Sequence, residues 1–223
     1  KKALIKISAR VNEVHFCSFK EKDDNMIIRL EEKKDYKEVE TLTREAFWNV
    51  YRPGCFEHLV VHKIREDKCF VKELDYVIEE NHKIVANIIY AKGELTLKDG
   101  STQDTLLFGP ISVLPEYQNK GYGSEIIKYT LNKAKELGYS EVFITGNPEY
   151  YHRFGFESAS KYKIYHKEIG QDGECPVFMI NILNKDKFNI NEAIYNDPEI
   201  YNISEDELEE FEKQFPKKEK RKD

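Results

Sequence analysis

A junction between an extended apolar segment and an amphipathic helix constrains the fold of this chain most. Residues 109–127 read GPISVLPEYQNKGYGSEII, in which a β-branched run meets a proline and then two glycines separated by one residue. The helix predicted for 121–137 follows at once and ends at Gly138, as helices commonly end at glycine. The next apolar run, EVFITG, is predicted to be a short strand. We expect it to be parallel to the strand before the helix, because a crossover helix joins the two.

The remaining segments predict a mixed α/β domain whose central sheet is mainly antiparallel and flanked by helices. From Met26 a strand leads into an amphipathic helix with Val39, Leu42, Ala46, Phe47 and Val50 at helical spacing, and a second helix is expected at 56–66. Short polar links separate three strands, which indicates a meander: DYVIEE, KIVANIIYAKGELTL and DTLLFGPISVL. NPEYYHRF is expected to form a short helix, and ECPVFMINIL the last strand.

The two ends differ from the central segment, so we expect a domain over residues 26–183. Residues 1–25 are interpreted as an N-terminal arm, with an additional edge strand as the alternative. Residues 184–223 are interpreted as a C-terminal extension with an acidic helix and a basic end. In that helix Ser204 and Glu207 have the spacing of a capping box.

Composition excludes several classes of protein. A net charge of −6 and a pI of about 5.7 argue against a general nucleic-acid binder. Cys17, Cys55, Cys69 and Cys175 lie far apart, which favours reduced thiols in a cytoplasmic protein over disulfides or a zinc site. No apolar run approaches the ~18 residues of a membrane span, so we expect no membrane partner. We expect no metal, because His58 and His62 have no third ligand nearby in sequence.

The glycine turn has the chemistry of an anion site. The first turn of a helix presents N–H groups without intrahelical partners at the positive end of the helix dipole. Glycines let an anion approach these amides, and Lys120 would add a cation. The turn is neither a Walker loop nor a Rossmann GxGxxG motif. A pyrophosphate would fit it, while an ordinary glycine-containing turn is the alternative.

Two motifs resemble those of the GNAT superfamily of N-acetyltransferases. PISVLPEYQNKGYGSEII is similar to the family's motif A, in which a strand feeds the helix that binds the pyrophosphate of coenzyme A. NPEYYHRFGFES resembles the family's second signature, a short helix that ends in GF. The resemblance covers about residues 26–183 and implies the GNAT fold of acyl-CoA N-acyltransferases.

The resemblance implies acetyl-CoA as co-substrate, bound between the strand that ends near Leu114 and the strand at Val142–Thr145, which splay apart in the family. Ile111, Ser112 and Val113 would contact the pantetheine arm, with the Val113 N–H near the thioester carbonyl. The residues implied at the pyrophosphate are Gln118, Asn119, Lys120, Gly121, Tyr122, Gly123 and Ser124. Asn147 is implied near the coenzyme, with a helix N-cap as the alternative.

The implied reaction is direct attack of a primary amine on the thioester. Tyr151 lies four residues before Gly155, where the family carries its tyrosine general acid, and would protonate the departing thiolate. The alternative is that Tyr151 only fills the core. No general base is identified: Glu149, His152, Glu73 and Asp75 are candidates that are equally explained as solvated surface groups.

The resemblance places acceptor specificity around FWNVYRPGCFEH, where Trp48, Tyr51, Arg52, Phe56, Glu57 and His58 would form an aromatic cleft or pack between helices. The acceptor would be a small molecule or a peptide with a primary amine. The alternative function is a non-catalytic acyl-CoA sensor or an interaction module on the same fold. A longer acyl-CoA donor and a homodimer also stay open.

Overall fold

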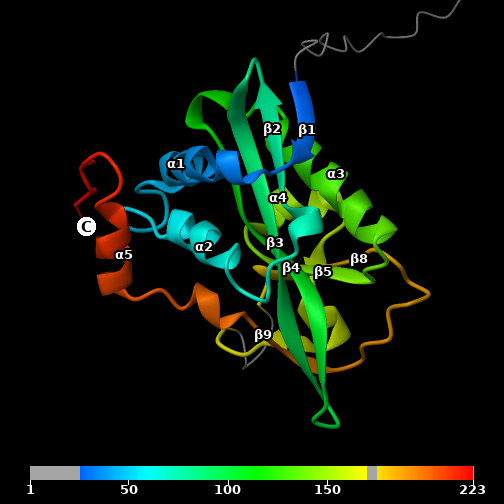
Figure 1. Ribbon diagram of the computed structural model, residues 1–223. Coiled ribbons are helices and arrows are strands. Elements are labelled where there is room, and N and C mark those ends of the chain that lie inside the picture. Colours follow the sequence, from blue (N-terminus) through cyan, green and yellow to red (C-terminus); the bar gives the residue numbers. More distant parts are fainter. Residues whose placement is uncertain (1–25, 170–174, 223) are drawn as a thin grey trace, which may run out of the picture.

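The computed structural model describes residues 26–169 and 175–222, and a nine-stranded mixed sheet lies at the centre of these ranges (Figure 1). Hydrogen-bonded neighbours follow the order β1-β2-β3-β4-β5-β8-β6, and β9 pairs with both β3 and β7. The strands are β1 Met26–Leu30, β2 Tyr76–Glu80, β3 Lys83–Leu97, β4 Thr102–Val113, β5 Glu141–Thr145, β6 Glu157–Ser158, β7 Ile164–His166, β8 Phe178–Ile182 and β9 Ala193–Asn196. Most pairs are antiparallel; β4 with β5 and β7 with β9 are parallel.

Helices cover both faces of the sheet. They are α1 Tyr36–Phe47, α2 Glu57–Ile64, α3 Tyr122–Glu136, α4 Pro148–Tyr151 and α5 Glu205–Glu212. In Figure 1, α1 and α2 lie on one side of the sheet, α3 lies on the other, and α5 packs outside α1 and α2. None of these helices combines the length and the apolar character needed to cross a lipid bilayer.

Strand alternation explains the two layers, because successive side chains of a strand point to opposite faces. In β3, Ile89 and Ala91 belong to the apolar cluster that includes the inner faces of α1 and α2. Their neighbours Ile88 and Tyr90 belong to the cluster beneath α3. A long run of apolar residues in β3 is therefore buried on both faces, as expected of a central strand.

The predicted fold class is confirmed: the chain is mixed α/β with a mostly antiparallel sheet, and α3 joins the parallel strands β4 and β5. The expectation that Val50 lies on the first helix is wrong. That helix ends at Phe47, and Asn49 has a positive φ of 62°, which the helix cannot accommodate. The arm expected at 1–25 lies outside the described residues.

The segment predicted as a C-terminal extension contacts the domain at several places, among them β9 and α5. β9 pairs with β3 over Glu94–Leu97, beyond the stretch of β3 that β2 occupies. Further on, α5 has the predicted Ser204–Glu207 capping box and packs Phe211 and Phe215 against the ring of His58. Glu212 accepts two hydrogen bonds from Arg44 of α1, and its Oε1 lies 2.7 Å from His58 Nε2. The pKa of His58 is lowered to about 4 by burial, so this ring is neutral near pH 7.

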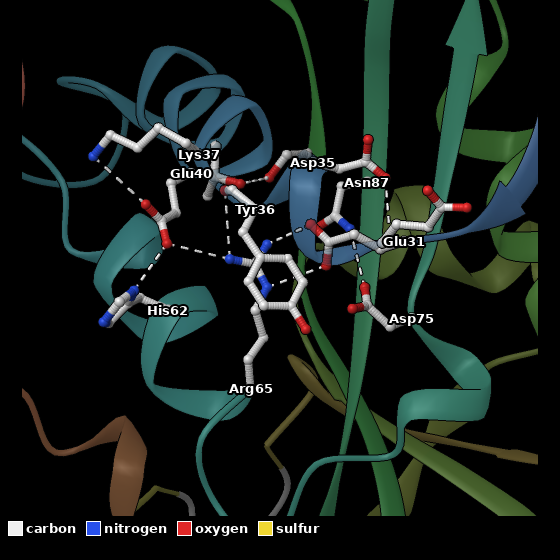
Figure 2. A network of polar contacts seen from close by, with 12 residues as sticks. Glu31, Asp35, Tyr36, Lys37, Glu40, His62, Arg65, Asp75 and Asn87 are labelled. Atoms are coloured by element: carbon white, nitrogen blue, oxygen red, sulfur yellow. Dashed lines mark hydrogen bonds and ion pairs between the residues drawn. The ribbon is translucent and has the colours of Figure 1, made fainter.

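A buried polar network holds α1 and α2 to the sheet (Figure 2). Arg65, with 2% of its side chain exposed, extends from the end of α2 between two carboxylates. It donates to Glu31 through Nη2 at 2.5 Å and Nε at 3.1 Å, and to Glu40 of α1 through Nη1 at 3.3 Å. Its guanidinium also stacks 4.1 Å from the centre of the Tyr36 ring. One arginine thus joins the segment after β1, α1 and α2.

Replacing Arg65 with alanine should lower the free energy of unfolding by about 3–5 kcal/mol, because Glu31 and Glu40 would lose their buried counter-charge. Urea denaturation measures this loss. Lys63→Ala is the matched control, since its ion pair with Glu207 is exposed and exposed pairs contribute ~0–1 kcal/mol. A loss below 1 kcal/mol for Arg65→Ala would contradict a stabilising role for the network.

Candidate functional site

The parallel strands β4 and β5 separate soon after they meet. The one residue pair between them in the described part of the chain is Leu107 opposite Phe143. Both strands continue beyond this pair, but their residues are no longer paired with each other. A cavity of about 1490 Å³ opens where they diverge, lined by residues 107–111 of β4, by residues 143–145 of β5 and by residues 146–147 after it. The gap between two neighbouring strands therefore becomes the floor of a cleft.

The end of β4 directs backbone groups into this cleft. Leu114 N–H donates to Val85 O of β3 at 3.0 Å, so the alternation along the strand turns the N–H and C=O of Val113 and Ile111 away from β3. Consistent with this direction, the Val113 carbonyl accepts a hydrogen bond from Gln118 Nε2 at 3.1 Å. β4 therefore offers main-chain hydrogen-bonding groups to whatever occupies the cleft.

The N terminus of α3 opens into the same cleft. Its N-cap is Gly121, which has a left-handed backbone conformation with φ 97° and no side chain that could cap the first turn. Gly123 gives space for a neighbour, since a Cβ there would lie 2.6 Å from Tyr150 Oη. The first turn of α3 therefore combines a helix dipole with open space beside Gly121, which suits an anion.

Most of the residues predicted to bind the coenzyme line the cleft: Ile111, Val113, Gln118, Asn119, Gly121, Tyr122, Gly123, Ser124 and Asn147. Ser112 is buried on the other face, where its Oγ donates to Thr43 Oγ1 of α1 at 3.1 Å. Lys120 is exposed, and its Nζ lies 5.2 Å from the centre of the Tyr117 ring. Asn147 also caps α4, because its Oδ1 accepts from Glu149 N–H at 3.0 Å.

Tyr151 lies on the wall of the cleft next to β5. It belongs to α4, is largely buried, and packs against the rings of Phe108 and Phe156 with centroids 6.0 and 5.9 Å away. Burial raises the pKa of Tyr151, and the nearby phenols of Tyr150 and Tyr51 raise it further. The hydroxyl therefore keeps its proton at neutral pH.

The four candidates weighed as a base from sequence do not line the cleft. Glu73, Glu149 and His152 are exposed, and Asp75 is buried elsewhere, in the network beside Asn87. The acidic and histidine residues that line the cleft are instead Glu57, His166, Glu168 and Asp197. Glu57 opens α2, and the other three come from β7 and the segments after β7 and β9.

His166 and Asp197 form a closed set of hydrogen bonds. His166 Nε2 lies 2.9 Å from Asp197 Oδ2, and His166 Nδ1 accepts from Glu168 N–H at 3.1 Å. Asp197 Oδ1 accepts from Tyr195 Oη at 3.0 Å. Since Nδ1 is an acceptor, the neutral ring carries its proton on Nε2 and donates it to Asp197. Sequence reasoning missed this pair, although the alternation of Ala193, Ile194 and Tyr195 is the pattern of a strand.

The segment predicted to form the acceptor side divides into two groups. Phe47, Val50, Tyr51, Phe56 and Glu57 line the cleft. The others turn away from it. Trp48 Nε1 donates to Glu219 O at 2.8 Å, Arg52 pairs with Glu205, and His58 is buried beneath α5. About half of the predicted set therefore belongs to helix packing and to the contact with the C-terminal segment.

No cluster of three or more histidine, cysteine or acidic side chains with the arrangement of a metal site occurs in the described parts of the chain. Cys55, Cys69 and Cys175 are free thiols. Burial raises the pKa of Cys55 and, to about 12, that of Cys69, so both stay protonated at neutral pH.

Comparison with known proteins identifies relatives over most of the chain. Residues 27–159 match the family model described as an acetyltransferase (GNAT) domain. The chain is 24% identical over 164 residues to the N-acetyltransferase YhbS of Escherichia coli K12, covering 74% of this chain and 91% of YhbS. A second E. coli K12 N-acetyltransferase, YjhQ, is 30% identical over 108 residues, which are 48% of this chain and 58% of YjhQ.

Solved structures give the same result for the fold. The crystal structure of E. coli YhbS in complex with CoA has a TM-score of 0.69 at 22% identity, covering 80% of this chain and 93% of that one. A GNAT acetyltransferase of Brucella melitensis in complex with acetyl-CoA has a TM-score of 0.64 at 22% identity, covering 79% and 98%.

Replacing Gly146 with alanine should displace Tyr151, because the added Cβ would lie 2.4 Å from Tyr151 Cε2. We expect the free energy of unfolding to fall by about 1–3 kcal/mol, as for other overpacked sites, and the melting temperature to fall with it. Thr145→Ala, an exposed change at the neighbouring position, should alter it by less than ~0.5 kcal/mol. Equal melting temperatures for the two variants would show that the ring is not held against Gly146.

Proposed function

The chain belongs to the GNAT family of acetyltransferases, and from this premise we propose that it transfers an acetyl group from acetyl-CoA to a primary amine. Direct attack of the amine on the thioester, without a covalent enzyme intermediate, is part of the proposal. The observation that carries it is a single cleft that contains the end of β4, the glycine-capped start of α3 and the Tyr151 phenol.

The coenzyme half of the cleft fits the proposed co-substrate. The start of α3, from Gly121 to Ser124, would hold the pyrophosphate through main-chain N–H groups and the helix dipole. The main-chain groups of Ile111 and Val113, turned away from β3, would hold the amide groups of the pantetheine arm. The co-substrate supplies a thioester, whose thiolate leaves when the amine attacks. The complexes of the two structural relatives with CoA and acetyl-CoA support this assignment.

The reaction requires proton transfers, and side chains of this chain can assist them. An alkylammonium acceptor, with a pKa of ~10.4, loses two protons on its way to a neutral amide. The departing thiolate, with an ordinary pKa of ~8.5, takes up one of them, so one proton is released overall. We assign to Tyr151 the transfer of a proton to the sulfur. Its phenol stays protonated at neutral pH, lines the cleft and is fixed by the aromatic rings around it.

Replacing Tyr151 with phenylalanine tests this function. The ring packing is retained and the proton is lost, so we expect kcat to fall about 10²–10⁴-fold, the usual range for general acid catalysis, while affinity for acetyl-CoA stays unchanged. Release of free thiol in the presence of a panel of primary amines measures turnover, and calorimetry measures binding of acetyl-CoA. His152→Ala, next to Tyr151 but exposed, is the matched control.

Two outcomes would contradict the proposal. Equal turnover of Tyr151→Phe and the unmodified protein would remove the role of the phenol. Tight binding of acetyl-CoA by the unmodified protein, with no turnover of any amine, would favour a non-catalytic acyl-CoA-binding protein of the same fold.

A further inference from the structure

We propose that Glu57 is the catalytic residue that takes the proton from the acceptor amine. The inference rests on the proposed function and names the base that it lacks. Glu57 is the first residue of α2 and lines the cleft together with Tyr51 and Phe56 of the preceding loop. Glu57 thus lines the cleft on the α1–α2 wall, while Tyr151 lines it from α4.

The other histidine and acidic residues that line the cleft are less suited to accept a proton. Both ring nitrogens of His166 are engaged, one with Asp197 and one with a main-chain N–H. Both oxygens of Asp197 are engaged, with His166 and with the Tyr195 hydroxyl. Glu168 is exposed to solvent. Glu57 differs, since the hydrogen bonds to its carboxylate come from main-chain N–H groups, among them Phe56 N–H to Oε2 at 3.0 Å.

The surroundings of Glu57 favour proton uptake. Burial raises the pKa of Glu57 above the ordinary value of a glutamate, while main-chain N–H groups and the Arg52 guanidinium act in the opposite direction. The Arg52 charge is partly compensated, because its Nη2 lies 2.6 Å from a Glu205 oxygen. A half-buried carboxylate whose pKa is closer to neutrality is a better general base than an exposed one.

The proton balance of the reaction then closes. The acceptor ammonium gives one proton to Glu57, which passes it to water, and the freed nitrogen lone pair forms the C–N bond with the thioester carbonyl. When the C–S bond breaks, its electron pair stays on sulfur, which takes a proton from Tyr151. The nitrogen of the new amide loses its remaining excess proton, and that proton restores the Tyr151 phenol.

Glu57→Gln removes the base and keeps the shape and the hydrogen-bonding capacity of the side chain. We expect kcat/KM for the amine at pH 7 to fall about 10²–10³-fold, with unchanged calorimetric affinity for acetyl-CoA. The ratio of the two rates should shrink toward pH 10, where the free amine is abundant without a base. Glu57→Asp should restore part of the activity. Glu149→Gln, which removes an exposed carboxylate outside the cleft, should leave the rate within about twofold.

The outcomes separate the two claims. If Glu57→Gln turns over amines as fast as the unmodified protein, or if its deficit is the same at pH 7 and pH 10, Glu57 is not the base and the proposed function still stands. If the unmodified protein acetylates no amine, both the proposed function and the role of Glu57 are overturned.

A different observation supports a second inference: we propose that Arg221 positions the acceptor wall of the cleft. Helix α1 ends at Phe47, and residues 49–51 belong to the loop that follows it. Arg221 donates to three consecutive carbonyls of this loop, to Asn49 O at 3.2 Å, Val50 O at 3.4 Å and Tyr51 O at 3.3 Å. Its main-chain N–H also donates to Asn49 Oδ1 at 3.0 Å.

These contacts lie behind the cleft, since the side chains of Val50 and Tyr51 line it. The same loop is held at its start by Glu219, whose carbonyl accepts from Trp48 Nε1 and Asn49 Nδ2. The guanidinium presents its donors in a fixed planar fork, whereas an ammonium is a compact, strongly hydrated point charge on a flexible stem. The C-terminal segment therefore acts on the acceptor side through the main chain of the loop.

Arg221→Ala should raise the KM for the amine about tenfold, corresponding to ~1.4 kcal/mol, with the KM for acetyl-CoA unchanged. Arg221→Lys should restore little of this loss, and Lys222→Ala should have no effect. Amide hydrogen exchange provides a readout independent of turnover, and protection of residues 49–51 should fall in Arg221→Ala. Unchanged acceptor KM together with unchanged protection would overturn the inference.

Discussion

The separation of β4 and β5 is the constraint on which the rest of the site depends. With Leu107 paired to Phe143 and the strands diverging beyond, the sheet leaves main-chain groups of β4 unused by a neighbouring strand. Buried main-chain groups require partners, so a sheet that opens in this way is complete only when something occupies the gap. The helix that crosses between the two strands must begin at the same opening, which brings its positive end to the gap.

The opposite wall is held by buried charge rather than by the sheet. Arg65 fixes α2 to α1 and to the segment after β1, and Arg44 fixes α1 to Glu212 of α5. Buried ion pairs add little net stability, but losing one partner is costly, so such pairs specify one arrangement. The loop with Tyr51 connects α1 and α2, and Glu57 is the first residue of α2.

The proposed coenzyme half of the site could be predicted from sequence because its determinants are local. A strand, a turn with glycines and a helix follow one another within residues 109–127, and the short helix with Tyr151 has its own compact motif. Ser112 shows the limit of this reasoning, since a motif gives the strand but the pleat decides which side chain faces the cleft. The end of α1 at Phe47 was missed because Asn49 breaks a helical apolar pattern that continues to Val50.

The proposed acceptor half could not be predicted in the same way, because it is assembled from distant segments. Glu57, Asp197 and Tyr201 approach one cleft from α2, from the end of β9 and from the 3-10 helix Glu199–Tyr201. Tyr201 even donates to Gly109 O at 2.6 Å, which ties the late segment to the point where β4 leaves β5. A binding surface made of main-chain groups tolerates many side-chain substitutions. A binding surface made of side chains from distant segments changes when any one of these side chains is replaced. Acceptor specificity can therefore vary in this fold while the coenzyme half stays as it is.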